Sequence, residues 1–144
     1  MKQSRRMFTR TLAAVAVVGA LGASFPGGVH AQQGQPVKIG LLATLEGPFA
    51  AGGQDGMRGA EMAVRERGGV VAGRKIELIK ASSDAKPDVA VNATRKLVEQ
   101  DKVDIMVGPL SGSEGIAVKD YSKTQPNITF INGSSGAQAT TLVN

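Results

Sequence analysis

Apolar runs of strand length alternate with segments of helical periodicity from Val37 onward, and this alternation limits the possible folds more than any other feature. Residues 37–44 are almost continuously apolar after Lys38, as in a central strand that helices cover on both faces. Further strands are predicted at 76–80, near an edge of the sheet, and at 105–108 and 128–132. The pattern predicts an α/β fold with a Rossmann-like, doubly wound parallel sheet of four strands.

Three helices are predicted between these strands. After a glycine-rich loop over residues 46–56, apolar residues recur at helical spacing between Asp55 and Gly68, where Gly68-Gly69 ends the helix. Pro87 suits the first turn of the second helix. Its inward face is predicted to hold Val89, Ala90, Ala93, Thr94, Leu97 and Val98. The shorter third helix would present Ile116, Ala117, Val118 and Tyr121, and the second would be capped from Ser82, Ser83 and Asp84.

Residues 1–31 have the pattern of an export signal peptide. A basic leader precedes an apolar run over residues 12–21, and small residues ending at Ala31 suit a signal peptidase. The apolar run is too short to span a membrane. The sequence Ser-Arg-Arg-Met-Phe at residues 4–8 favours the twin-arginine route over the general secretory route. We expect cleavage after about Ala31, a periplasmic product, a spacer over residues 32–36 and a folded domain over residues 37–144.

The composition excludes several classes of function. Four of the 17 Lys and Arg residues lie in the leader, which leaves 13 against 12 Asp and Glu. With this balance and few aromatic residues, neither nucleic acid nor a membrane surface is an expected partner. The absence of cysteine excludes a lipid-anchored mature N-terminus and thiolate chemistry, and the one histidine, His30, lies in the leader. We therefore expect no metal, no cofactor and no Ser-His-Asp or Cys-based catalysis.

Two features that could suggest an enzyme have simpler explanations. The acidic residues at 84, 88, 99, 101 and 104 are spread over helix ends and loops, where solvated charge is usual. The glycines at 52, 53, 56 and 59 lack the G-x-G-x-x-G spacing that brings backbone close to a pyrophosphate. A dinucleotide-binding enzyme is therefore not expected.

The segment from Ile105 to Gly115 is a candidate anion-binding loop. Its apolar run ends at Gly108-Pro109 and gives way to small hydroxylated residues directly before a helical pattern. In an open parallel sheet, ligands sit beyond the carboxyl ends of the strands, where helix N-termini offer unpaired N–H groups to anions. Ser111 and Glu114 also have the spacing of a capping box, so helix capping alone would explain both residues. The same loop could cap the helix and bind a ligand at once, so both roles stay open for these residues.

Several motifs occur in a fixed order along residues 37–142: Gly47-Pro48-x-Ala50-x-x-Gly53, Gly59-Ala60, Gly68-Gly69-Val70-x-x-Gly73, Ser83-Asp84 and Gly108-Pro109-Leu110-Ser111. This order resembles the type I periplasmic substrate-binding proteins, and within them the leucine/isoleucine/valine-binding branch that serves ABC transporters. Members of that family have two Rossmann-like lobes that close on a small ligand. The resemblance implies that residues 37–144 are an incomplete first lobe, which we expect to bind weakly by itself and to expose a sheet edge prone to pairing.

The resemblance implies a non-enzymatic protein that captures a branched-chain amino acid or a related small carboxylate for an ABC permease of the inner membrane. The implied ligand contacts are Phe49, Gly52, Leu110, Ser111, Gly112, Ser134, Ser135 and Gly136. Gly52 stands where branched-chain amino acid binders often carry an aromatic residue, and Gly136 where they often carry threonine. An aromatic acid, an amide or another small carboxylate therefore stays open as the ligand. The alternative functions are a periplasmic ligand sensor and, less favoured, a Rossmann-like periplasmic enzyme.

Overall fold

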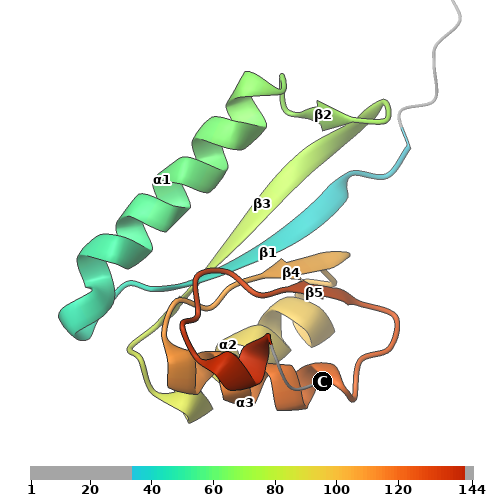
Figure 1. The fold of residues 1–144 in the computed structure, drawn as a ribbon. Helices are drawn as coiled ribbons and strands as arrows, with labels where there is room; N and C mark the ends of the chain where they lie inside the picture. The colour runs from blue at the N-terminus through green and yellow to red at the C-terminus, as the bar shows by residue number, and fades with distance from the viewer. Residues whose placement is uncertain (1–33, 142–144) are drawn as a thin grey trace, which may run out of the picture. The chain divides into compact units, whose positions relative to one another are not determined.

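A five-stranded sheet in the order β2-β3-β1-β4-β5 organises the chain, and the computed structural model describes residues 34–141 (Figure 1). The central strand β1 (Val37–Thr44) pairs in parallel with β3 (Arg74–Ser83) and with β4 (Ile105–Val107). On the far side β4 pairs in parallel with β5 (Thr129–Ile131). The predicted α/β fold with a doubly wound parallel sheet is confirmed. It carries one short strand more than the four expected, β2 (Val70–Val71), which pairs antiparallel with β3.

Helices cover both faces of this sheet. Figure 1 shows α1 (Ala50–Glu66) on one side, and α2 (Pro87–Arg95) and α3 (Gly112–Ser122) on the other. A π-helical turn, η2 (Lys96–Gln100), continues α2, and two 3₁₀ turns, η1 (Gly47–Phe49) and η3 (Gln138–Thr140), complete the elements. The chain builds the sheet outward from β1 to β3, then returns to the other side of β1 for β4 and β5. The strand order therefore reverses between β1 and β4, where open α/β sheets bind ligands.

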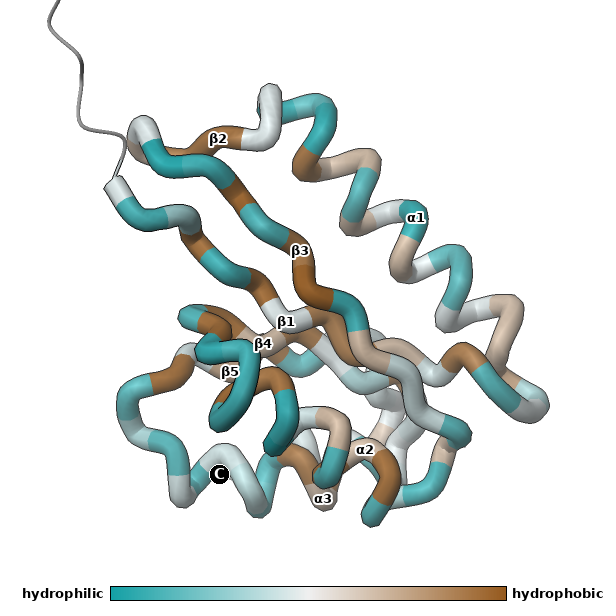
Figure 2. Tube along the Cα trace, turned by 180° about the vertical axis from the view of Figure 1, so that it is seen from behind, coloured by the Kyte–Doolittle hydropathy of each residue, from teal (hydrophilic) through white to brown (hydrophobic). Residues whose placement is uncertain are grey.

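The core has one part on each face of the sheet because β1 sends alternate side chains to opposite sides. Leu42 packs with α2, α3 and β4 in the larger cluster, whose buried residues are Leu42, Ala90, Leu97, Val98, Val103, Met106 and Val118. Leu41 and Ala43 pack with Met57 of α1 in the smaller one. The prediction that residues 37–44 form a strand covered on both faces is confirmed. In Figure 2, β3 alternates between hydrophilic and hydrophobic residues, as expected for a strand with one drier face.

The first helix begins five residues earlier than the glycine pattern predicts. A loop was expected over residues 46–56, but α1 starts at Ala50 and contains Gly52, Gly53 and Gly56. Pro48 lies in the 3₁₀ turn that leads into the helix, where its restricted φ suits a helix start. A Cβ added at Gly53 would overlap the carbonyl oxygen of Thr44, so the glycine there lets the helix lie directly against β1. The predicted stop is confirmed: Gly68 and Gly69 have φ of 71° and 68°.

The additional strand arises from a tight hairpin that the sequence pattern does not predict. Val71 pairs with Arg74, and the two residues between them, Ala72 and Gly73, both have positive φ, 48° and 76°. Two-residue connections of this kind match the twist of antiparallel strands. The hairpin makes β3 the next-to-edge strand, which confirms the expectation for residues 76–80.

Most of the predicted inward helix faces are confirmed, with two exceptions. On α2 and η2, Ala90, Thr94, Leu97 and Val98 are buried and Ala93 packs against the core, but Val89 is 37% exposed. It lies about 100° around the helix from the fully buried Ala90, on the flank of the buried face. On α3, Val118 is buried, whereas Ile116 is 40% exposed. Ile116 is two positions from both Glu114 and Val118 and so points away from the face that they share.

No helix within residues 34–141 is long and apolar enough to cross a membrane. The predicted signal peptide and the first residues of the predicted spacer lie outside the described residues, so both stay predictions.

Candidate ligand-binding site

Four parallel strands end at one edge of the sheet, and each is followed by polar or glycine-rich residues. The last residue of β1 is Thr44 and the last residue of β3 is Ser83, while Gly108 follows β4 and Asn132 follows β5. Because parallel strands share their carboxyl edge, these loops from distant parts of the sequence meet there. This edge holds the candidate site.

A crevice of about 190 Å³ opens between this edge and α1. The lining residues are Leu41, Leu42, Ala43, Gly52, Gly53, Gly56, Ala60, Val107, Gly108, Pro109, Leu110, Gly133 and Ser134. Three of the predicted ligand contacts, Gly52, Leu110 and Ser134, therefore come together from three separate segments. Most of the lining is apolar or glycine, which suits the apolar part of a small ligand. The volume is below the roughly 300–1,000 Å³ of complete ligand pockets.

The two predicted ligand loops lie against each other and against β1. Gly108 has φ of 122°, and a Cβ added there would overlap the carbonyl oxygen of Leu42. A Cβ on Gly133, in the loop after β5, would lie 3.0 Å from both the Gly108 Cα and the Pro109 oxygen. Only glycine combines this backbone angle with so close an approach at position 108. The loop after β4 is thereby pressed between β1 and the loop after β5.

The predicted capping box at the start of α3 is confirmed. The Ser111 hydroxyl accepts a hydrogen bond from the Glu114 N–H at 3.4 Å, and Glu114 Oε2 accepts one from the Ser111 N–H at 3.3 Å. No hydrogen bond within residues 34–141 uses the N–H groups of Gly112 and Ser113. These two groups lie at the first two positions of the helix, where the helix dipole is positive. They are free donors for an anion.

A chain of buried polar side chains lies beneath this helix start, and the sequence pattern does not reveal it. The Thr44 hydroxyl donates to Glu114 Oε2 at 2.9 Å, and the Ser83 hydroxyl donates to Thr44 Oγ1 at 3.4 Å. Thr44 and Glu114 are fully buried, and Ser83 nearly so. The only signal in the sequence is that Thr44 and Ser83 each end an apolar strand. In the structure both residues turn inward rather than toward solvent.

The expectation that Ser82, Ser83 and Asp84 cap α2 is wrong. The N-cap of α2 is Lys86, without a side-chain cap, and Ser83 is engaged in the buried chain instead. Asp84 Oδ1 accepts a hydrogen bond from the Lys86 N–H at 3.2 Å, which orders the turn before the helix. The hydrogen bond from the Lys86 ammonium lowers the pKa of the Asp84 carboxyl below its ordinary value.

The other predicted contacts take different positions. Ser135 is buried against Gly115 of α3, and Gly112 lies against Ala137 of the same loop. Gly136 is exposed, with open space where a side chain would be. Phe49 is 48% exposed beside the start of α1 and is not among the residues that line the crevice. The lining from β1 and from Gly53, Gly56 and Ala60 was not predicted, because the glycine-rich segment was expected to be a loop.

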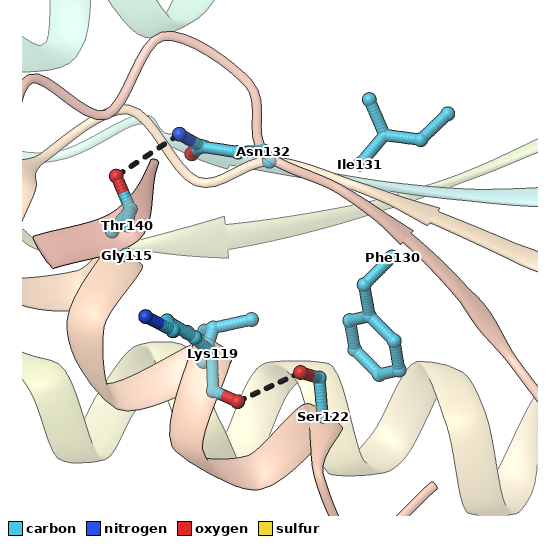
Figure 3. Close-up of a pocket in the computed structure, with 9 residues that line it drawn as sticks. Gly115, Lys119, Ser122, Phe130, Ile131, Asn132 and Thr140 are labelled. Carbon is cyan, nitrogen blue, oxygen red and sulfur yellow. Dashed lines mark hydrogen bonds between the residues drawn. The ribbon is translucent and has the colours of Figure 1, made fainter. Parts of the chain in front are cut away.

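A second hollow of about 180 Å³ lies between α3 and β5 (Figure 3). Its polar groups bond to neighbouring groups of the chain: the Asn132 amide donates to the Thr140 hydroxyl at 3.1 Å, and the Ser122 hydroxyl to the Lys119 carbonyl at 2.7 Å. The Lys119 ammonium donates to the Ala139 carbonyl at 2.6 Å. The crevice beside α1 is the stronger candidate, because its wall includes Leu110, which lies two residues before the free N–H groups of α3. Among residues 34–141, no three His, Cys, Asp or Glu side chains lie together to hold a metal ion.

Comparison with known proteins identifies the family of this chain. The sequence profile of the family described as "Periplasmic binding protein" matches residues 36–142. The chain belongs to the periplasmic binding protein family. A relative from Pseudomonas aeruginosa named "Amino acid binding protein" is 31% identical over 139 residues, which are 95% of this chain and 36% of that protein.

Solved structures of periplasmic binding proteins share the fold. A solute binding protein of an ABC transporter from R. palustris, in complex with benzoate, is 29% identical with a TM-score of 0.68, over 72% of this chain and 29% of that one. The substrate binding protein of a branched-chain amino acid transporter from Streptococcus pneumoniae, in complex with isoleucine, is 30% identical with a TM-score of 0.61, over 67% and 28%. This periplasmic binding protein chain spans 28% to 36% of the length of these relatives.

Proposed function

We propose that this chain is the carboxylate-holding part of an exported, non-enzymatic solute-binding protein of an ABC-type uptake system. The observation that carries the proposal is the pair of free N–H groups, on Gly112 and Ser113, at the start of α3, which directly follows the crevice-lining residue Leu110 and the N-cap Ser111 at the β1–β4 switch point. The protein would work in the periplasm after removal of residues 1–31 and deliver its ligand to a permease of the inner membrane. Membership of the family supports both statements.

The ligand would place its carboxylate on the loop after β4 and its apolar body in the crevice. Hydrogen bonds from N–H groups to an ionised carboxylate are stronger than neutral ones, so no Arg or Lys is required. Leu110 and Ser134 lie in the crevice wall, while Ser111 and Gly112 begin α3, and Ser135 and Gly136 follow Ser134 in the loop after β5. The hydroxyl of Ser134 is exposed and can turn toward a bound carboxylate.

We propose a small monocarboxylate with an aromatic or branched aliphatic body as the ligand. Gly52 leaves the crevice floor without a side chain, and the nearest atom to a Cβ there would be Leu110 Cδ2 at 3.4 Å. A flat ring or a branched chain can lie against this surface. The complexes of relatives with benzoate and with isoleucine support both ligand classes.

The proposal is tested by titrating the 144-residue chain with benzoate and with isoleucine while recording amide NMR spectra. We expect the largest shifts at Gly112 and Ser113, with smaller ones at Gly52, Leu110 and Ser134. Benzamide, which has the same ring but no negative charge, should move the crevice signals and leave the Gly112 and Ser113 amides in place. The ligand class is wrong if neither acid moves these two amides at millimolar concentration.

Gly112→Pro separates the N–H donor from the shape of the loop. Proline is tolerated at the first position of a helix, and Ser111 before it already has an extended backbone, with φ of −78° and ψ of 149°. The variant removes one donor, so we expect benzoate affinity to fall roughly three- to tenfold. Gly112→Ala is the matched control, because it adds the same Cβ beside Ala137 and keeps the N–H. Equal affinities for the two variants would contradict a role for this N–H group.

A further inference from the structure

Glu114, in the first turn of α3, has a fully buried carboxyl group. Its exposed fraction is 0%, and none of the ion pairs within residues 34–141 includes it. Its Oε2 atom accepts hydrogen bonds from the Thr44 hydroxyl and the Ser111 N–H. One oxygen therefore joins the end of β1 to the loop after β4, across 70 residues of sequence.

Two buried polar atoms of the described residues have no hydrogen-bond partner: Glu114 Oε1 and Ser135 Oγ. A carboxylate oxygen lacks a donor, and a hydroxyl lacks an acceptor, so each supplies what the other needs. Glu114 lies in the first turn of α3, and Ser135, from the loop after β5, packs against the same turn. Ser135 Oγ packs against Gly115 so closely that a Cβ on that glycine would overlap it, and Gly115 directly follows Glu114. Leaving both atoms unpaired in the interior would be costly.

We propose that Glu114 is a positioning residue that holds three strand ends at once, with the Ser135 hydroxyl donating to Oε1 directly or through one buried water. The carboxylate then binds Thr44 at the end of β1, Ser111 after β4 and Ser135 after β5. This inference rests on the proposed function in one respect: the loops that Glu114 joins are those that we propose bind the ligand.

The arrangement has a consequence for the ligand. Glu114, rather than the ligand, occupies the Ser111 N–H, so the donors that remain at the start of α3 are those of Gly112 and Ser113. Because the same carboxylate holds both loops, displacement of Ser135 alters the position of Ser111. The site is thus aligned before a ligand arrives, which reduces the ordering cost of binding.

The test is a double-mutant cycle of Glu114→Ala and Ser135→Ala in the full chain, without ligand. Amide hydrogen exchange is measured at Ser111 and at residues 133–136, relative to exchange at Leu42 in the core. We expect Glu114→Ala to speed exchange at Ser111 roughly three- to tenfold, and Glu114→Gln, which keeps an acceptor oxygen, to restore most of the protection. Glu66→Ala, at an exposed glutamate of α1, is the control and should leave Ser111 unchanged.

At residues 133–136 in the loop after β5, Glu114→Ala should also speed amide exchange. We expect this increase in rate to be smaller by about threefold when Ser135→Ala is already present. Additive effects of the two substitutions on exchange would overturn the proposed pair of Glu114 and Ser135. If the Ser111 amide exchanges as fast in Glu114→Gln as in Glu114→Ala, the role of Glu114 as a hydrogen-bond acceptor is overturned. If Glu114→Ala does not fold, the amide shift of Ser111 decides: Ser135→Ala should move it, and Ser134→Ala, at the exposed neighbour, should not. An unmoved Ser111 amide in Ser135→Ala overturns the pair.

All these measurements are made without ligand, so they fail or succeed independently of the proposed function. If the cycle is additive while Gly112→Pro still weakens benzoate binding, only the positioning role is lost. If benzoate and isoleucine do not bind while the cycle shows coupling, the ligand class is lost and Glu114 retains its role in joining the loops.

Discussion

At the scale of single residues, two glycines of α1 differ in whether the structure has room for a side chain. Gly53 faces β1, and a Cβ there would overlap the carbonyl oxygen of Thr44. Gly56 lies one turn later in α1 and has open space where a Cβ would be. The first glycine is required by the contact between helix and strand, whereas the second only lowers the helix propensity.

We therefore predict opposite effects of the same substitution. Gly53→Ala should lower the free energy of unfolding by about 1–3 kcal/mol, because backbone atoms must move apart to admit the methyl group. Gly56→Ala should raise it by about 0.5–1 kcal/mol through better helix propensity. Urea denaturation followed by circular dichroism measures both. A pair of variants with the same sign of change would show that α1 does not rest on β1 through Gly53.

At the scale of elements, the β2–β3 hairpin depends on a turn that alanine does not favour. Ala72 has φ of 48°, in the left-handed region, where a side chain costs about 1–2 kcal/mol. Gly73 follows with φ of 76°. The hairpin is held by the pairs of Val70 with Lys75 and of Val71 with Arg74, so the turn supplies a large part of its stability.

Ala72→Gly should stabilise the hairpin, by up to about 1 kcal/mol, because relief of the backbone strain outweighs the greater freedom of glycine in the unfolded chain. Gly73→Ala, with the opposite change at the neighbouring position, should destabilise it by about 1 kcal/mol. Amide exchange at Val71 and Arg74 reports the hairpin directly. A slower exchange in Gly73→Ala than in Ala72→Gly would contradict the turn geometry.

At the scale of the whole molecule, three surface ion pairs make stability depend on pH. Glu61 of α1 bonds to Lys80 of β3. Asp84 pairs with Lys86 before α2, and Asp120 of α3 pairs with Lys123. In each case the hydrogen bond from the lysine lowers the pKa of the carboxyl below its ordinary value, 4.5 for Glu61 and 3.8 for the two aspartates.

We predict that stability is lost on the acid side through these groups. A carboxyl with a lowered pKa in the folded state stabilises the fold above its ordinary pKa, and this contribution disappears as the pH falls through the folded value. The loss should therefore begin below about pH 4.5. Urea denaturation from about pH 2 to 7 measures the slope, which Glu61→Gln should flatten. High salt should weaken the effect, because the lysine of each pair is exposed to solvent.

At high pH, stability should instead be lost as the pH rises. Burial, reinforced by the hydrogen bond to Glu99, raises the pKa of the Tyr121 hydroxyl above 10.0, so the folded state favours its neutral form. The Asp84 carboxylate raises the pKa of Lys86 above 10.5. Both contributions are present below these ordinary values and are lost as the pH rises through the raised ones.

Features that depend only on neighbouring residues could be predicted from the sequence. The apolar run of β1, the capping box of Ser111 and Glu114 and the glycine stop after α1 all follow from local spacing and local backbone chemistry. The order of these motifs also predicted the family. These predictions are confirmed because a strand, a cap or a helix end needs only a few consecutive residues to form.

Tertiary structure decided everything that depends on residues far apart in the chain. Residue 53 must be glycine because α1 lies directly against Thr44 there, and Ser83 faces inward, where its hydroxyl donates a hydrogen bond to Thr44. The bond between Thr44 and Glu114 joins positions 70 residues apart, and no local pattern marks it. Such contacts arise only when parallel strands bring their carboxyl ends to one edge, so the loop after β4 could be predicted from the sequence, whereas the crevice and the buried polar chain could not.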